Sequence, residues 1–251
     1  MKITNEIPNS WRDLQDKVCK YLNQAGFQAE TTKTIDTVRG TVEVDVFATG
    51  NDEKLKQFVC ECKHWETPVP KEKIHAFRTV VQDTGSMLGI FISKSGYQKG
   101  AVEAAAYSNV LLKDWNGFLD LIAVQWLKTR FCEVVRLGYP LGVYVDPLDV
   151  PEQIFNDKLT SEDYKKLNIK YMQSYYSVKA LEMGSFPVDK PLIVDGITFE
   201  DFNSFFNYVE TKYRQGIEEF EKLFAHCPVE QWKLDISNSR MLEPRILDYL
   251  K

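Results

Sequence analysis

Two runs of residues decide the fold: Glu43-Val44-Asp45-Val46-Phe47 and Gln57-Phe58-Val59-Cys60-Glu61-Cys62-Lys63-His64-Trp65. Both are rich in β-branched and aromatic residues, and the turn-forming cluster Gly50-Asn51-Asp52 lies between them. This pattern predicts two neighbouring antiparallel strands.

Side chains alternate between the two faces of a strand, so the polar residues of these runs gather on one face. Glu43 and Asp45 share a face, as do Glu61 and Lys63. Two carboxylates hold a hard divalent cation through oxygen, and a lysine neutralises charge on a phosphate or orients a water. The residues predicted to point the other way, into a core, are Val44, Val46, Cys60 and Cys62.

This arrangement resembles the core motif of the PD-(D/E)xK, or restriction-endonuclease-like, nucleases, and the Mrr-type branch in particular. The resemblance covers roughly residues 10–115 and rests on an ordered series of helix, Asp strand, Glu-x-Lys strand, helix and Ile-rich strand. The matching segments are Gly40 to Val46, Glu61 to Trp65, Gly89 to Ser93, and Gly96 to Ala101.

The resemblance implies a nuclease site made of Asp45, Glu61 and Lys63, with Mg²⁺ held by the two acids and the backbone carbonyl of Cys62. Mn²⁺ is a possible substitute, DNA is the expected substrate, and many such enzymes dimerise. In Mrr-like enzymes the first helix often carries a Glu that faces the metal. The matching position here is Gln15, which hydrogen-bonds but adds no negative charge.

Composition indicates a globular protein, with 44% hydrophobic and 27% charged residues. We expect no signal peptide and no membrane-spanning run. The five cysteines are not spaced as in a small disulfide-rich domain. Strand alternation places the thiols of Cys60 and Cys62 on the buried face. We therefore expect a cytoplasmic protein with free thiols, in which Cys60 and Cys62 do not bind a metal together.

The net charge of −5 is unevenly spread. Residues 1–137 hold 18 Lys and Arg against 17 Asp and Glu, whereas residues 138–251 hold 13 against 19. We predict a nuclease-like domain over 1–137 and a mostly helical domain of unassigned role over 138–251. Phosphate contacts need a local basic surface, and neither half carries a large excess of basic residues. The excess of acidic residues in 138–251 makes this half a candidate for docking a basic protein partner.

The first half predicts an α/β fold, a mixed sheet flanked by helices. Helices are expected at 11–25, 71–83 and 96–108. Strands are expected at 27–34, 87–93, where a continuous apolar run predicts a buried parallel strand, and 109–113. The second half predicts helices at 116–136, 161–182 and 200–225, a break at 138–142 and a hairpin at 192–199 around Asp-Gly. The tyrosines of 161–182 favour core packing over base stacking.

For several charged or aromatic residues, the sequence allows either a role at the site or a purely structural role. Arg39 is either a phosphate contact or a solvated turn residue, and Glu43 either joins the site or is a surface acid. Lys94 and Lys99 lie near a strand end and a helix start, where a phosphate fits. Lys71, Lys73 and Arg78 suit a solvated helix face or phosphate contact. His64 suits packing or hydrogen bonding, and Trp65 suits closing the sheet.

The sequence thus predicts a metal-dependent endonuclease acting in restriction or defence against foreign DNA. One alternative is a catalytically silent protein that keeps the fold as a binding module for nucleic acid or protein. Another is a nuclease subunit that is active only within a complex.

Overall fold

The computed structural model describes residues 1–50, 56–150, 152–185 and 190–225. It divides into two compact units. The sheet unit is Glu6–Trp126, and the helical unit is Met1–Asn5 together with Leu127–Lys251. The predicted domain boundary between residues 137 and 138 stays a prediction. Within the described residues, no helix has the length and apolar character to cross a bilayer.

The sheet unit is built on five strands in the order β1-β2-β3-β4-β5. The β1–β2 and β2–β3 pairs are antiparallel, and the β3–β4 and β4–β5 pairs are parallel. The predicted mixed sheet, including its buried parallel strand, is confirmed. The turn predicted at Asn51-Asp52 lies outside the described residues. The strands are β1 (Gln28–Thr37), β2 (Gly40–Thr49), β3 (Gln57–Lys63), β4 (Leu88–Ser93) and β5 (Val110–Lys113).

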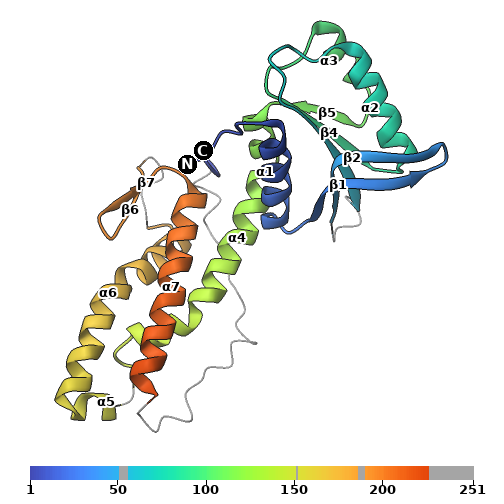
Figure 1. Ribbon diagram of the computed structural model, residues 1–251. Helices are drawn as coiled ribbons and strands as arrows, with labels where there is room; N and C mark the ends of the chain where they lie inside the picture. Colours follow the sequence, from blue (N-terminus) through green and yellow to red (C-terminus); the bar gives the residue numbers. More distant parts are fainter. Residues whose placement is uncertain (51–55, 151, 186–189, 226–251) are drawn as a thin grey trace. The chain divides into compact units, whose positions relative to one another are not determined.

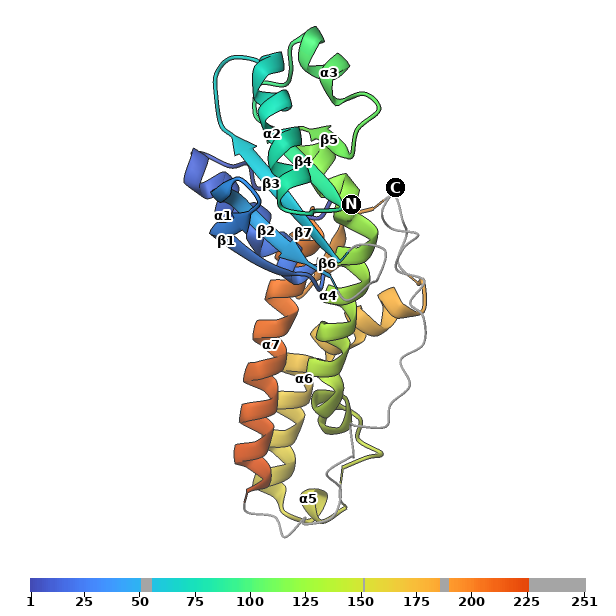
Figure 2. The ribbon, with the colours of Figure 1, turned by 90° about the vertical axis from the view of Figure 1, so that its right-hand side faces the viewer.

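Helices cover both faces of this sheet (Figures 1 and 2). On one face lies α1 (Trp11–Gln24), whose first turn is capped by the Ser10 hydroxyl. On the other lie α2 (Lys71–Asp83) and the short α3 (Lys99–Ala105). The core under α2 and α3 contains Val44, Val59, Val69, Ile74, Phe77, Val81, Phe91, Ala101, Ala104 and Val110.

The residues of β2 that point toward α2 and α3 change from even-numbered to odd-numbered at Asp45. Val42 and Val44 pack in the core under α2 and α3, and Phe47 packs there too. Regular alternation keeps only even-numbered or only odd-numbered residues on one face, so it is interrupted between residues 44 and 47. Val44 and Val46 are both buried in a core, as predicted, but the interruption means that they do not share one face of the sheet.

The partner strand is distorted at the same level. The β1–β2 register passes from Thr31↔Val46 to Lys33↔Val44 without a pair at Thr32. Thr32 has a φ of 55°, a left-handed conformation that a β-branched residue rarely adopts. Both strands thus depart from regular geometry at the level of Asp45.

The helical unit contains most of α4 (Trp115–Val145), with α5 (Gln153–Asn156), α6 (Lys158–Glu182) and α7 (Phe202–Phe224). The break predicted at 138–142 is wrong, because α4 continues through Pro140. Its glycines serve close packing instead. A Cβ at Gly138 would lie 2.3 Å from the Tyr213 ring, and one at Gly142 would lie 2.4 Å from the Tyr175 hydroxyl.

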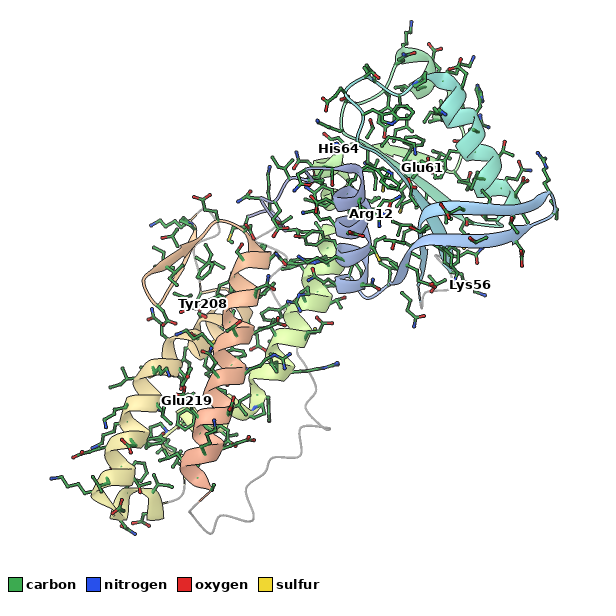
Figure 3. The ribbon with its side chains drawn as sticks, viewed as in Figure 1. Arg12, Lys56, Glu61, His64, Tyr208 and Glu219 are labelled. Atoms are coloured by element: carbon green, nitrogen blue, oxygen red, sulfur yellow. The ribbon has the colours of Figure 1, made fainter. Side chains whose placement is uncertain are left out.

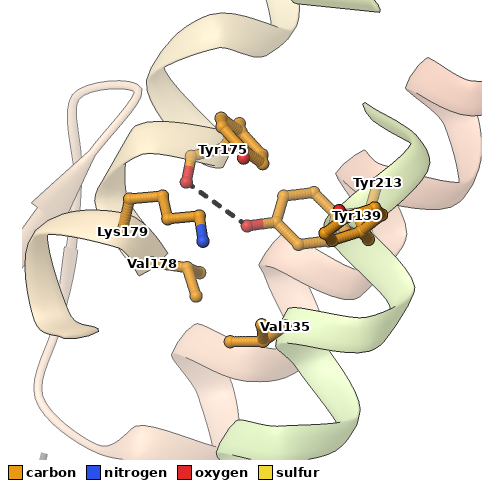
Figure 4. A pocket seen from close by; sticks show the side chains of 7 residues that line it. Val135, Tyr139, Tyr175, Val178, Lys179 and Tyr213 are labelled. Atoms are coloured by element: carbon orange, nitrogen blue, oxygen red, sulfur yellow. Dashed lines mark hydrogen bonds between the residues drawn. The ribbon is translucent and has the colours of Figure 1, made fainter. Parts of the chain in front are cut away.

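Aromatic side chains fill the space between these helices. Tyr164 and Tyr171 on α6 are buried, as the core-packing interpretation predicted. Tyr213 donates its hydroxyl to the Tyr175 carbonyl across a small cavity between α4, α6 and α7 (Figure 4). The cavity has room for about one water, so it is no substrate site.

The predicted hairpin forms from β6 (Leu192–Val194) and β7 (Ile197–Phe199). Asp195 and Gly196 both have positive φ, as a two-residue type I′ turn requires. The start of the chain then pairs with the start of α7, through a bridge between Lys2 and Asp201. The helix predicted at 200–225 forms as α7, which ends at Phe224.

Candidate active site

Asp45 sits where strands β2 and β3 separate. The last paired residues of the two strands are Val46 and Cys60. Beyond it, the Cys62 backbone N–H donates to Asp45 Oδ2 at 2.7 Å instead of to a backbone carbonyl of β2. The carboxylate therefore terminates the ladder, and its position is fixed by main chain.

Helix α1 supplies the second hydrogen bond to this carboxylate. Gln15 Nε2 donates to Asp45 Oδ1 at 2.6 Å. Gln15 is only 4% exposed, so α1 places a buried polar group against the sheet for this one contact. The amphipathic pattern of α1, with Leu14 and Val18 buried beside Gln15, fixes the helical phase that aims it.

Lys63 lies between the two acids. Its Nζ is 2.5 Å from Glu61 Oε1 and 3.7 Å from Asp45 Oδ2. Glu61 and Lys63 share a face of β3, two residues apart. Figure 3 labels Glu61 in the sheet unit. The three side chains are partly buried, between 16% and 25% exposed. The structure thus brings together Asp45, Glu61, Lys63 and Gln15.

Comparison with known families now bears on this cluster. Residues 8–122 match the family model Mrr_cat, described as a restriction endonuclease. Residues 8–122 are a restriction endonuclease domain of this family. The predicted resemblance is therefore confirmed, and the match holds all four clustered residues.

The other comparisons add little. No curated protein matches the chain. A crystal structure of a protein of unknown function, AF1548, aligns with 86% of this chain and 100% of its own, at 15% identity and a TM-score of 0.39. A likeness at that level carries no argument about the restriction endonuclease domain or the helical unit.

The charges in the domain's cluster are strongly coupled. Burial raises the pKa of Glu61, and the nearby charge of Asp45 raises it further. Burial acts to lower the pKa of Lys63, but the charge and hydrogen bond of Glu61 outweigh burial, so that this pKa is raised overall. Lys63 therefore keeps its positive charge at neutral pH, and Glu61 gives up its proton less readily than an exposed glutamate does.

The oxygen atoms of the cluster suit a hard divalent cation. Asp45 and Glu61 offer two carboxylates, and Mg²⁺ is commonly held by one or two carboxylates with waters completing its shell. Each carboxylate oxygen accepts more than one interaction, so the contacts from Gln15 and Cys62 leave Asp45 able to bind metal. No group of three or more His, Cys, Asp or Glu suited to a metal occurs in the described part of the chain.

The predicted phosphate contacts are spread out. Arg39 pairs with Asp83 at the far end of α2 from the cluster. Lys94 follows β4, and its N–H donates to the Lys63 carbonyl, so it lies at the cluster's end of the sheet. Lys99 begins α3 and is 92% exposed. The structure places Lys94 beside the site but does not bring Arg39 there.

Three further residues around the motif have defined contacts. His64 contacts the Pro8 carbonyl, which agrees with the predicted hydrogen-bonding role. The role of Trp65 in closing the sheet stays a prediction. Trp65 follows the end of β3 and is 36% exposed, and its ring lies near the amines of both Lys63 and Lys73. Sequence reasoning missed this pairing. The only available signal was the spacing of Trp65, two residues after Lys63.

The thiols of Cys60 and Cys62 are unreactive. Cys60 and Cys62 are fully buried, and burial raises the pKa of both far above the usual thiol range. A protonated thiol is a poor metal ligand and a poor nucleophile. This agrees with the prediction that Cys60 and Cys62 pack in the core.

Proposed function

We propose that the restriction endonuclease domain hydrolyses phosphodiester bonds of DNA with Mg²⁺, or Mn²⁺ in its place, in restriction or defence against foreign DNA. One observation carries the proposal: a single, partly buried cluster holds Asp45, Glu61 and the Lys63 amine, inside the restriction endonuclease domain.

Each residue has a role that follows from its contacts. Gln15 and the Cys62 N–H hold Asp45 in one orientation, which pre-organises its remaining lone pairs. Lys63 carries a positive charge that offsets the negative charge developing on the attacked phosphate, or orients the attacking water. Glu61 keeps that amine in place through its ion pair.

The metal would be held by Asp45 and Glu61, with the backbone carbonyl of Cys62 as a third oxygen. When bound, Mg²⁺ supplies Lewis-acid activation of water and neutralises phosphate charge. A cation would also relieve the repulsion that raises the pKa of Glu61. The donor set therefore favours metal binding.

The wider setting is part of the same proposal. A homodimer would place two sites on the two strands of a duplex, and the acidic residues of 138–251 would dock a basic protein partner. The buried thiols of Cys60 and Cys62 suit the reducing cytoplasm.

One observation favours a silent or partner-dependent alternative. Gln15 stands where related domains often carry a third carboxylate, so this site has less negative charge with which to hold a cation. Calorimetry separates the possibilities. A catalytic site binds Mg²⁺ or Mn²⁺ in the wild type and loses this binding in Asp45→Asn.

Nicking of supercoiled plasmid tests the activity itself. We expect nicking in Mg²⁺, none in EDTA, and none from Asp45→Ala or Lys63→Ala. Metal binding without nicking would favour a nuclease that needs a partner, and absence of both would favour a binding module.

A further inference from the structure

Trp65 and Lys73 lie in contact with each other next to the cluster. The Lys73 amine lies 5.8 Å from the centre of the Trp65 ring, and the Lys63 amine lies 5.9 Å from it. Both distances are within the range of cation–π attraction. Trp65 follows the end of β3, and Lys73 is in the first turn of α2. One indole therefore links the motif lysine with a lysine from a different element.

The charge of Lys73 is less neutralised than that of Lys94 or Arg39, two of the predicted phosphate contacts. Lys94 is paired with Glu66 at 2.5 Å, and Arg39 is paired with Asp83 at 3.4 Å. Lys73 forms no ion pair with any acid in the described ranges, and its side chain is exposed. Its positive charge is therefore available to an anion that approaches the site.

The two lysines differ in what they can contact. Lys63 is 18% exposed and already lies between two carboxylates. Lys73 is exposed to solvent, and its amine lies by the same Trp65 ring. A DNA strand carries a phosphate about every 3.4 Å along the helix axis. A DNA strand with one phosphate at Lys63 thus carries neighbouring phosphates close to Lys73.

We infer that Lys73 binds a backbone phosphate of the DNA strand flanking the scissile position, and that Trp65 is the positioning residue that holds the Lys73 amine there. This inference rests on the proposed nuclease function and names the contact that seats the strand. It also gives the nearly neutral sheet unit the local basic surface that binding to DNA requires.

Salt dependence of DNA binding tests the phosphate contact. Affinity for a labelled duplex is measured by fluorescence anisotropy in EDTA over a series of salt concentrations. Replacing one phosphate-contacting lysine lowers the slope of log K against log salt by about 0.9. We expect this decrease, with weaker binding, for Lys73→Gln. Lys166→Gln removes an exposed charge from α6 and should leave the slope unchanged.

The role of Trp65 is tested by coupling. Trp65→Leu keeps apolar bulk but removes the aromatic face, and should lower affinity and slope in the same direction. Trp65→Phe should restore most of both. The double variant Trp65→Leu, Lys73→Gln should bind no worse than Lys73→Gln alone, because residues that act through one contact are not additive. Additive losses would overturn the positioning role.

The outcomes distinguish failure of the Lys73 contact from failure of the proposed nuclease function. A wild type that binds and nicks DNA, with Lys73→Gln showing the wild-type slope, overturns the Lys73 contact and leaves the nuclease intact. A wild type that neither binds nor nicks DNA overturns both. If Trp65→Leu fails to fold, as judged by circular dichroism, Lys73→Gln and Trp65→Phe still decide the question.

Discussion

The side-chain amide of Gln15 donates a 2.6 Å hydrogen bond to Asp45 Oδ1, joining α1 to the point where β2 and β3 separate. Gln15 is thus a positioning residue for the acid rather than an acid itself. The cluster keeps its geometry through a neutral group, at the cost of one negative charge that related domains often have.

Replacing Gln15 with Glu tests this exchange of charge for a hydrogen bond. A buried carboxylate cannot donate to Asp45 and repels it, so we expect Gln15→Glu to lose about 1–3 kcal/mol of stability without metal. Millimolar Mg²⁺ should recover part of the loss, because a third carboxylate strengthens cation binding. Gln28→Glu, an exposed site on β1, is the control and should change neither quantity. Equal melting temperatures for Gln15→Glu and wild type would contradict the prediction.

Glu61 gives a prediction about pH. Its pKa is raised by burial and by Asp45, so the folded protein holds this proton more tightly than the unfolded chain. Ionised Glu61 therefore costs stability, and the cost grows as pH rises above the unfolded value of about 4.3. We expect Glu61→Gln without metal to melt higher than wild type at pH 7, with the difference shrinking on acidification. A difference that grows on acidification would reverse the sign.

Thr32 gives a prediction about strain. Its φ of 55° is costly for a β-branched residue, and asparagine adopts this region more readily. Thr32→Asn should therefore gain up to about 1 kcal/mol in urea unfolding. Thr34→Asn, on the same strand without a positive φ, should lose stability, because asparagine disfavours strands. Similar losses in both variants would show that Thr32 is unstrained.

The sequence predicts the site better than it predicts the strand that carries it. Spacing along β3 places Glu61 and Lys63 on one face, and helical phase singles out Gln15. The interruption of alternation at Asp45 leaves no sequence signal, because it depends on β1 and on where the β2–β3 ladder stops. The contact between Trp65 and Lys73 joins separate elements and was missed for the same reason.

Gly138 on α4 gives a prediction about packing. Alanine in place of a helix-interior glycine usually gains about 1 kcal/mol. Here the new Cβ would lie 2.3 Å from the Tyr213 ring, so we expect Gly138→Ala to lose about 1–3 kcal/mol. Gly100→Ala, whose Cβ would meet Lys71 at an ordinary 3.5 Å, should lose nothing. Combining Gly138→Ala with Tyr213→Leu should cost less than the sum of the two single changes. Full additivity would contradict the clash.

The same glycine explains an error of sequence reasoning. Gly138 and Gly142 around Pro140 are typical of a helix break, and local propensity alone predicts one. Tertiary contacts override that propensity, because Tyr213 and Tyr175 occupy the space left by the missing Cβ atoms. The hairpin at Asp195-Gly196 was predictable, since its turn conformation depends on those two residues alone.

The central claim is that Asp45 and Lys63 act in one metal-dependent hydrolytic site. The most direct measurement is the rate of plasmid nicking in Mg²⁺ for wild type, Asp45→Asn, Lys63→Ala and the control Lys166→Ala, each also measured in EDTA. We predict that wild type and Lys166→Ala nick only with metal, and that either site substitution slows nicking by about 100-fold or more. Nicking that persists in both site variants, or in EDTA, would contradict the claim.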